Sequence, residues 1–162
     1  MTSHRAGKTR IAGVASALLL LASPAVAQAP NIEGTYHLVS RTLKDGRVIA
    51  PPEVIGLQTY TKKYRQFNIV SKEAGANLVS RSIIATYTLT PAEYTETPLL
   101  HVLVRGQEVR NLSGQPQRST VKVEGGRMTL APREFEQRTT VFEANGFTAT
   151  SAENVDRWEK VE

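Results

Sequence analysis

The sequence predicts an all-β fold, an antiparallel up-and-down β-barrel of eight to ten short strands. Apolar and polar residues alternate over short segments, as they do in strands that bury one face. Glycine, proline and Asp-Gly or Asn-Gly pairs end these segments too often for long helices to form. Closing such a sheet removes its edges, and the short connections favour a barrel over the alternative, a two-sheet β-sandwich.

Residues 1–27 are predicted to be a cleavable secretion signal rather than part of the fold. Basic residues precede an apolar run over 11–22, and the small-residue pattern Ala25-Val26-Ala27 follows it. This is the layout of a signal peptide. The alternative, an uncleaved membrane anchor, needs about 20 apolar residues, and the run is shorter. We therefore expect a single domain over 28–162, periplasmic or secreted, with no stable membrane anchor.

Charge and cysteine content narrow the class of protein. The chain carries a net charge of +5, but residues 1–27 hold three bases and no acids, which leaves +2 for the remainder. The remaining bases are scattered among acids, and the densest group, Lys62-Lys63-Tyr64-Arg65, is predicted to be a solvated turn. Nucleic acid is therefore not an expected partner. Because the chain has no cysteine, packing and sheet closure alone must stabilise the fold.

The N-terminal half is expected to form strands separated by turn residues. Asp45-Gly46 is a strong hairpin signal, and Gly56 is expected to mark a bend or bulge within a strand. A short helical turn is plausible only within 71–78. The strongest strand pattern lies at 80–89, where β-branched residues are dense. The expected strands are 36–41, 48–49, 54–61, 64–70 and 80–89.

The C-terminal half is expected to form a meander. Gly125-Gly126 and Asn145-Gly146 are hairpin signals. Pro98 is expected to interrupt a strand, and the segment 106–118 is expected to be the longest irregular stretch. The expected strands are 94–97, 99–104, 119–124, 127–130, 137–143, 147–150 and 155–161.

The segment Gly34-Thr35-Tyr36-His37-Leu38-Val39-Ser40 resembles the opening strand of bacterial lipocalin-like domains, which reads Gly-Thr-Trp-x-Leu-Val-Ser. Asp45-Gly46, the prolines at 51 and 52, and the ending Trp158-Glu159-Lys160 are similar to that family's pattern in the same order. The chain departs from the pattern in several places: Tyr36 replaces a tryptophan, Lys160 replaces an arginine, and the glycine usual after Tyr-Thr is missing at Lys62-Lys63-Tyr64. The resemblance implies a calycin-type barrel for a small, fairly apolar ligand, with Gly34, Tyr36 and Trp158 at its closed end, and it implies no catalytic residue.

The inner face of the strands supplies the candidate ligand cavity. An eight-stranded barrel can hold one small ligand or fill with side chains. Both alternatives stay open, because a slip of one residue exchanges the two faces of a strand. The candidate cavity residues are Leu38, Tyr60, Phe67, Ile83, Ala85, Tyr87, Glu96 and His101. Met128 is a further candidate for the inner face.

No catalytic or metal-binding motif is present in the predicted domain. Its two histidines, His37 and His101, have neither a nucleophile nor a cluster of further ligands beside them. We expect no metal and no cofactor. Glu96 is the first residue to test for acid–base chemistry, although an exposed strand carboxylate is the favoured interpretation.

The sequence leaves three functions open. The favoured one is a monomeric, exported barrel that binds or carries a small, mostly apolar molecule. The second is a cofactor-free isomerase, cyclase or lyase that acts inside the barrel. The third is an envelope interaction or inhibitor module that uses the segment Gly106–Arg118. Whether the protein is an enzyme is left open by the sequence.

Overall fold

The fold was analysed in a computed structural model that describes residues 31–72, 78–133 and 137–161. These residues form twelve β-strands and no helix. The strands are β1 (Gly34–Leu43), β2 (Val48–Ile49), β3 (Val54–Tyr60), β4 (Tyr64–Lys72), β5 (Leu78–Leu89), β6 (Glu93–Arg105), β7 (Glu108–Asn111), β8 (Gln117–Glu124), β9 (Arg127–Leu130), β10 (Thr139–Glu143), β11 (Gly146–Thr150) and β12 (Asn154–Lys160). No helix in the described part of the chain is long and apolar enough to cross a membrane.

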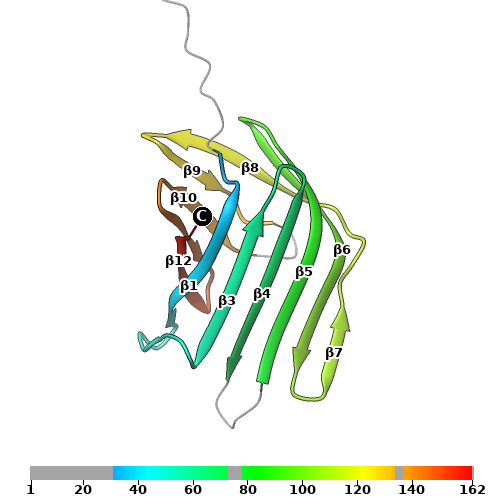
Figure 1. The fold of residues 1–162 in the computed structure, drawn as a ribbon, viewed down its shortest axis with the longest axis vertical. Coiled ribbons are helices and arrows are strands. Elements are labelled where there is room, and N and C mark those ends of the chain that lie inside the picture. Colours follow the sequence, from blue (N-terminus) through cyan, green and yellow to red (C-terminus); the bar gives the residue numbers. More distant parts are fainter. Residues whose placement is uncertain (1–30, 73–77, 134–136, 162) are drawn as a thin grey trace, which may run out of the picture.

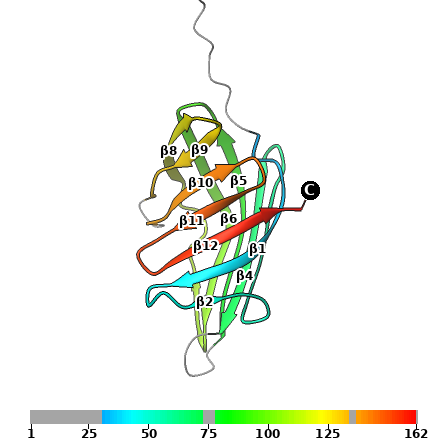
Figure 2. The same cartoon turned by 90° about the vertical axis from the view of Figure 1, so that its left-hand side faces the viewer.

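The strands form one sheet that closes on itself (Figure 1). The order runs β12-β11-β10-β9-β8-β6-β5-β4-β3-β1, and pairing of β12 with β1 completes the circle. Figure 2 shows β12 lying directly beside β1. Every pairing is antiparallel. The additional strands β2 and β7 pair alongside β1 and β6, respectively. The predicted up-and-down barrel is therefore confirmed, with ten strands in the closed sheet.

The predicted hairpins form where their turn residues stand. Gly46, at the turn between β1 and β2, has a φ of 84°. Gly125 and Gly126 have φ values of 55° and 78° and join β8 to β9. Asn145 lies in the turn that joins β10 to β11. These positive φ values are left-handed conformations that glycine adopts without a steric cost.

The expected interruption at Pro98 is wrong, because β6 runs through it as one strand. The register against β5 shifts between Ile84 and Ala85, which pair with Leu100 and Pro98, so Leu99 is an extra residue on β6. This bulge provides the local break in the ladder that a proline requires.

The expected irregular stretch over 106–118 is wrong for residues 108–111 and 117–118, which lie in strands. Gly106, with a φ of 58°, turns the chain so that β7 pairs back onto β6. Strand β8 already begins at Gln117. Of the segment in which a helical turn was plausible, Ser71 and Lys72 end β4 and Leu78 begins β5, and residues 73–77 lie outside the described residues.

Gly56 does not mark a bulge but pairs regularly with Ile69 of the neighbouring strand. A Cβ atom at Gly56 would lie 2.5 Å from Cη2 of Trp158 and 3.1 Å from Cβ of Leu38. Glycine is therefore required here because the indole ring lies against the backbone.

The core is rich in aromatic rings near the end of the barrel where β1 begins. The ring centroid of Phe147 lies 5.2 Å from that of Tyr36 and 5.3 Å from that of Trp158. Tyr36 also donates a hydrogen bond of 2.9 Å to the carbonyl oxygen of Ile32, just before β1. Tyr36 and Trp158 thus pack on the same phenylalanine, and Trp158 lies deeper in the barrel than Tyr36.

Candidate functional site

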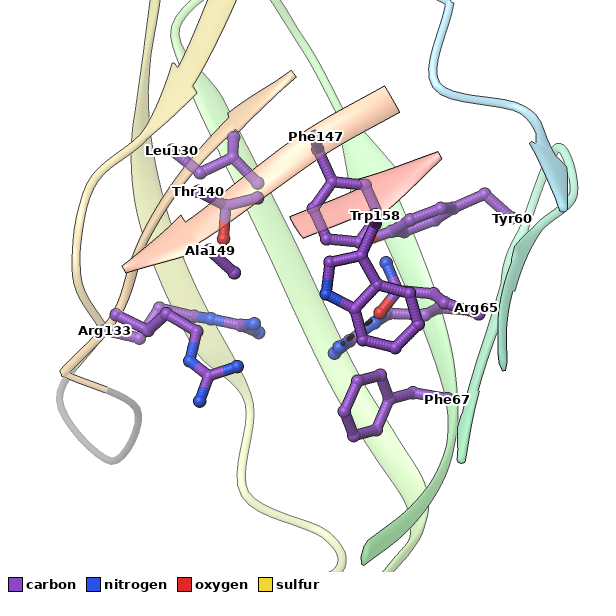
Figure 3. A pocket seen from close by; sticks show the side chains of 11 residues that line it. Tyr60, Arg65, Phe67, Leu130, Arg133, Thr140, Phe147, Ala149 and Trp158 are labelled. Carbon is purple, nitrogen blue, oxygen red and sulfur yellow. Dashed lines mark hydrogen bonds between the residues drawn. The ribbon is translucent and has the colours of Figure 1, made fainter. Parts of the chain in front are cut away.

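A small pocket lies inside the barrel, between two walls of strands (Figure 3). One wall comes from β3, β4 and β12, and the other comes from β9, β10, β11 and the connection between β9 and β10. The space open to water measures about 20 Å³, which is room for about one water molecule. The lining residues are Gln58, Tyr60, Arg65, Phe67, Leu130, Arg133, Arg138, Thr140, Phe147, Ala149 and Trp158.

Arg65 lies inside the barrel because of its place in β4. Residues two apart in a strand share a face, so Arg65 faces inward together with Phe67 and Ile69. Its side chain is only 6% exposed, and its Nη2 donates to Oε1 of Gln58 at 3.1 Å. The predicted solvated turn at 62–65 is thus right for the exposed residues 62–64 and wrong for Arg65.

Glu96 holds the centre of a buried ionic cluster. Its side chain is 1% exposed, and both carboxylate oxygens accept hydrogen bonds of 2.9 Å from Nη1 of Arg65. Nη1 of Arg133 lies 3.0 Å from Oε2, and the hydroxyl of Tyr94 donates to the same oxygen at 2.6 Å. The favoured interpretation of Glu96 as an exposed carboxylate is therefore wrong.

Tyr94 acts in this cluster as a hydrogen-bond donor. Burial raises the pKa of its hydroxyl well above the ordinary value, and the nearby Tyr60 and Glu96 raise it further. The hydroxyl therefore keeps its proton at neutral pH. Glu96 does not line the pocket, and the contacts to Arg65, Arg133 and Tyr94 surround its oxygens. This environment suits a carboxylate that organises its neighbours better than one that accepts a proton from a substrate.

A second buried ionic group lies beside the pocket. Asp156 is fully buried and accepts hydrogen bonds of 2.6 and 2.8 Å from Arg41. It also accepts a bond of 3.0 Å from Nη1 of Arg138, whose Nη2 donates to Asn154 at 3.2 Å. Arg138 lines the pocket, and its side chain is 19% exposed.

Trp158 contributes an unpaired donor to the pocket. Its ring is 2% exposed and stacks on Phe147 at an interplanar angle of 13°. Its Nε1 is buried and has no hydrogen-bond partner among the described residues. Figure 3 shows this nitrogen on the edge of the indole that faces Ala149 and Arg133, across the pocket.

The eight predicted cavity residues are all buried within the barrel. Only two of them, Tyr60 and Phe67, line the pocket. His101 is 4% exposed, and its backbone N–H donates to Oγ of Ser113 at 2.8 Å. No group of three or more potential metal ligands gathers anywhere in the described ranges. The other cavity candidates, Leu38, Ile83, Ala85, Tyr87, Glu96 and His101, therefore lie in a packed interior.

Five polar residues of the pocket lie outside the predicted set: Gln58, Arg65, Arg133, Arg138 and Thr140. Alternation along β4 would have placed Arg65 on the same face as Phe67, and alternation along β3 would have placed Gln58 with Tyr60. Arg138 falls in the expected strand 137–143, where alternation would have placed it on the face of Thr140 and Phe142. Arg133 lies after β9, outside any expected strand, so no periodicity predicts its direction.

Searches against protein-family models, curated proteins and solved structures found no match to this chain. The closed antiparallel barrel is compatible with a calycin-like fold, and the likeness to lipocalin-like domains stays a resemblance of sequence motifs.

Proposed function

We propose that the protein is an exported, monomeric barrel that binds or carries a small, mostly apolar molecule. The observation that carries this proposal is the pocket inside a closed barrel, with aromatic and aliphatic walls and a few convergent polar groups. Ligand sites in proteins commonly have this composition. Phe67, Leu130 and Phe147 supply apolar surface, and Arg65 and Arg133 supply polar groups.

The size of the pocket limits what can enter it. A space of about 20 Å³ is room for about one water molecule, so at most one end of a ligand can enter, and only when the lining side chains move apart. A bound ligand would therefore contact Phe67 and Trp158 with one end only.

Native mass spectrometry of the protein purified from the envelope of its own host tests the proposal. We expect a retained small molecule, or saturable binding from a panel of apolar compounds followed by the fluorescence of Trp158, the single tryptophan. The variant Phe67→Ala should weaken binding, and Leu57→Ala, at a 50% exposed position on β3, should not. A protein with no retained mass and no binding across the panel would contradict the proposal.

A second candidate function is an interaction module, because β7 is exposed along its whole length. β7 pairs only with β6 within the described residues, and Val109 on it is 66% exposed. Exposed strand edges can receive a further strand from a partner. If this function holds, Val109→Lys should abolish capture of envelope partners in a pull-down, and unchanged capture would dispose of it.

A further inference from the structure

We propose that the ligand carries a carboxylate, and that this head group binds inside the pocket between Trp158 Nε1 and the guanidinium group of Arg133. This inference rests on the proposed binding function and adds the chemistry of the ligand's buried end. It follows from the donors that line the pocket, from their charge and from the planar geometry of the guanidinium group.

Hydrogen-bond donors dominate the polar lining of the pocket. The indole N–H of Trp158 and the guanidinium groups of Arg65, Arg133 and Arg138 can donate and cannot accept. The one amide oxygen in the lining, Oε1 of Gln58, already accepts from Arg65. The hydroxyls of Tyr60 and Thr140 can both donate and accept. Because the indole and the three guanidinium groups only donate, a group that offers acceptors suits this space better than an ammonium group does.

The unpaired indole N–H is the strongest single indication of a missing acceptor. Burying a donor without a partner costs about 1–3 kcal/mol, and Trp158 is 2% exposed. Its Nε1 faces Ala149 and Arg133 across the pocket (Figure 3). An acceptor placed in the pocket would satisfy this donor and lie beside a guanidinium group at once.

The charge of the surrounding side chains favours an anion. Within the described residues, the two ionic groups contain four guanidinium groups and only two carboxylates, those of Glu96 and Asp156. Glu134 and Glu136 follow Arg133 in the chain and lie outside the described residues, so this balance applies to the described part alone. A ligand carboxylate would add a third anion beside these guanidinium groups.

The geometry of the guanidinium group favours a carboxylate among acceptors. About 20 Å³ is room for about one water, so a carboxylate enters only if the lining side chains move apart. A guanidinium group binds a planar carboxylate through two parallel hydrogen bonds. Phe147 and Ala149 lie beside this position, so the carbon chain that follows the head group meets apolar surface.

The single tryptophan makes the proposal directly testable. In a ¹⁵N-labelled protein the chain gives one indole N–H resonance, that of Trp158. We would titrate the whole secreted chain with octanoate, octanol and octylamine, which share a tail and differ in head group. We expect octanoate to move the indole resonance saturably, and octanol and octylamine to bind at least about tenfold more weakly, since charge-assisted hydrogen bonds contribute that much.

Variants assign the effect to the pocket. Arg133→Gln should weaken octanoate binding about tenfold or more, and Arg138→Gln provides a second variant if the first does not fold by circular dichroism. Arg157→Gln is the matched control, because Arg157 lies on the same strand as Trp158 and its side chain is 67% exposed. The control should bind octanoate as the unaltered protein does.

Three results would overturn the carboxylate site. Equal binding of octanol and octanoate would reject the head group and leave the proposed binding function intact. Undiminished octanoate binding by both arginine variants would reject the position of the site. No binding of any of the three compounds would count against the head group and against the proposed function together.

Discussion

Glu96 shows how one buried carboxylate can organise the interior of this barrel. It joins Arg65 from β4, Arg133 from the connection between β9 and β10, and Tyr94 from its own strand. Arg65 in turn reaches Gln58 on β3. Elements from opposite sides of the pocket therefore depend on the charge of a single residue.

Glu96→Gln should destabilise the protein strongly while the barrel keeps its shape. The change leaves the guanidinium groups of Arg65 and Arg133 buried without their common counter-ion, which costs about 3–5 kcal/mol. Urea unfolding followed by circular dichroism measures the loss. The control is Glu93→Gln on the same strand, since Glu93 pairs with Arg118 at a largely exposed position and exposed pairs contribute about 0–1 kcal/mol. A loss for Glu96→Gln no larger than that of the control would show that the cluster adds no stability.

Gly56→Ala should destabilise the protein through the ring of Trp158. The new Cβ would lie 2.5 Å from Cη2, and stacking on Phe147 prevents the indole from moving aside. Overpacking of this kind typically costs about 1–3 kcal/mol. Unfolding of Gly56→Ala, Trp158→Phe and the double variant forms a double-mutant cycle. The cost of Gly56→Ala should fall when the larger ring is absent, and an unchanged cost would place its origin elsewhere.

At the scale of the element, one edge of β6 pairs with two different strands, β8 and β7, while its other edge pairs with β5. Glu93–Glu96 pairs with β8, and the far half, from Val102 to Arg105, pairs with β7. Between the two halves, the segment after β7 covers the strand: Leu112 donates to the carbonyl of His101 at 2.7 Å, and Gly114 donates to that of Pro98 at 2.8 Å. The bulge at Leu99 thus lies where β6 changes neighbours.

The hairpin turns could be predicted from sequence, and this division of β6 could not. A pair such as Gly125-Gly126 determines the turn through its own backbone angles, so these two residues are enough to predict the turn. The effect of Pro98 depends on the neighbouring strand. A proline interrupts a regular hydrogen-bond ladder, but here an extra residue on β6 accommodates it. The same distinction applies to the pocket. Arg65 follows from strand alternation, whereas Arg133 lies after β9 and outside any strand, so alternation does not predict its direction.

The turn between β8 and β9 provides a test at this scale. Gly125 has a φ of 55°, and an added Cβ would meet no atom within 4 Å, so only backbone strain can oppose a substitution. Gly125→Val should cost about 1–2 kcal/mol, because a β-branched residue avoids this conformation. Gly125→Asn should be nearly neutral, since asparagine tolerates it. Chemical unfolding of both variants measures the difference, and equal losses would mean that the turn relaxes to another type.

At the scale of the whole molecule, closure of the sheet and burial of aromatic rings provide the stability that disulfides give to other proteins. The chain has no cysteine, and pairing of the first barrel strand with the last leaves no edge on the closed sheet. Tyrosines fill the end of the barrel where β1 begins, with the ring centroids of Tyr60 and Tyr36 6.3 Å apart and those of Tyr60 and Tyr87 5.5 Å apart. The stability of the barrel therefore depends on phenol groups that must stay neutral.

This dependence predicts a loss of stability in alkali. Burial raises the pKa of Tyr36 and of Tyr87 from 10.0 to about 12, with a smaller contribution from Tyr60. Their hydroxyls donate to the backbone carbonyls of Ile32 at 2.9 Å and Thr61 at 2.6 Å. Below pH 10 both groups are neutral in the folded and the unfolded chain, so their contribution is complete. Between pH 10 and 12 only the unfolded chain loses these protons, and each group then lowers the free energy of unfolding by about 1.4 kcal/mol per pH unit.

Urea unfolding at intervals from pH 8 to pH 11.5 measures this slope. The double variant Tyr36→Phe/Tyr87→Phe should start from a lower stability at pH 8, since each change removes a hydrogen bond worth about 1 kcal/mol. It should then lose less stability than the unaltered protein above pH 10, because phenylalanine cannot ionise. Tyr64→Phe, at a position that is 49% exposed, should keep the full slope. Parallel curves for all three proteins would mean that these buried phenols do not control the alkaline limit of the fold.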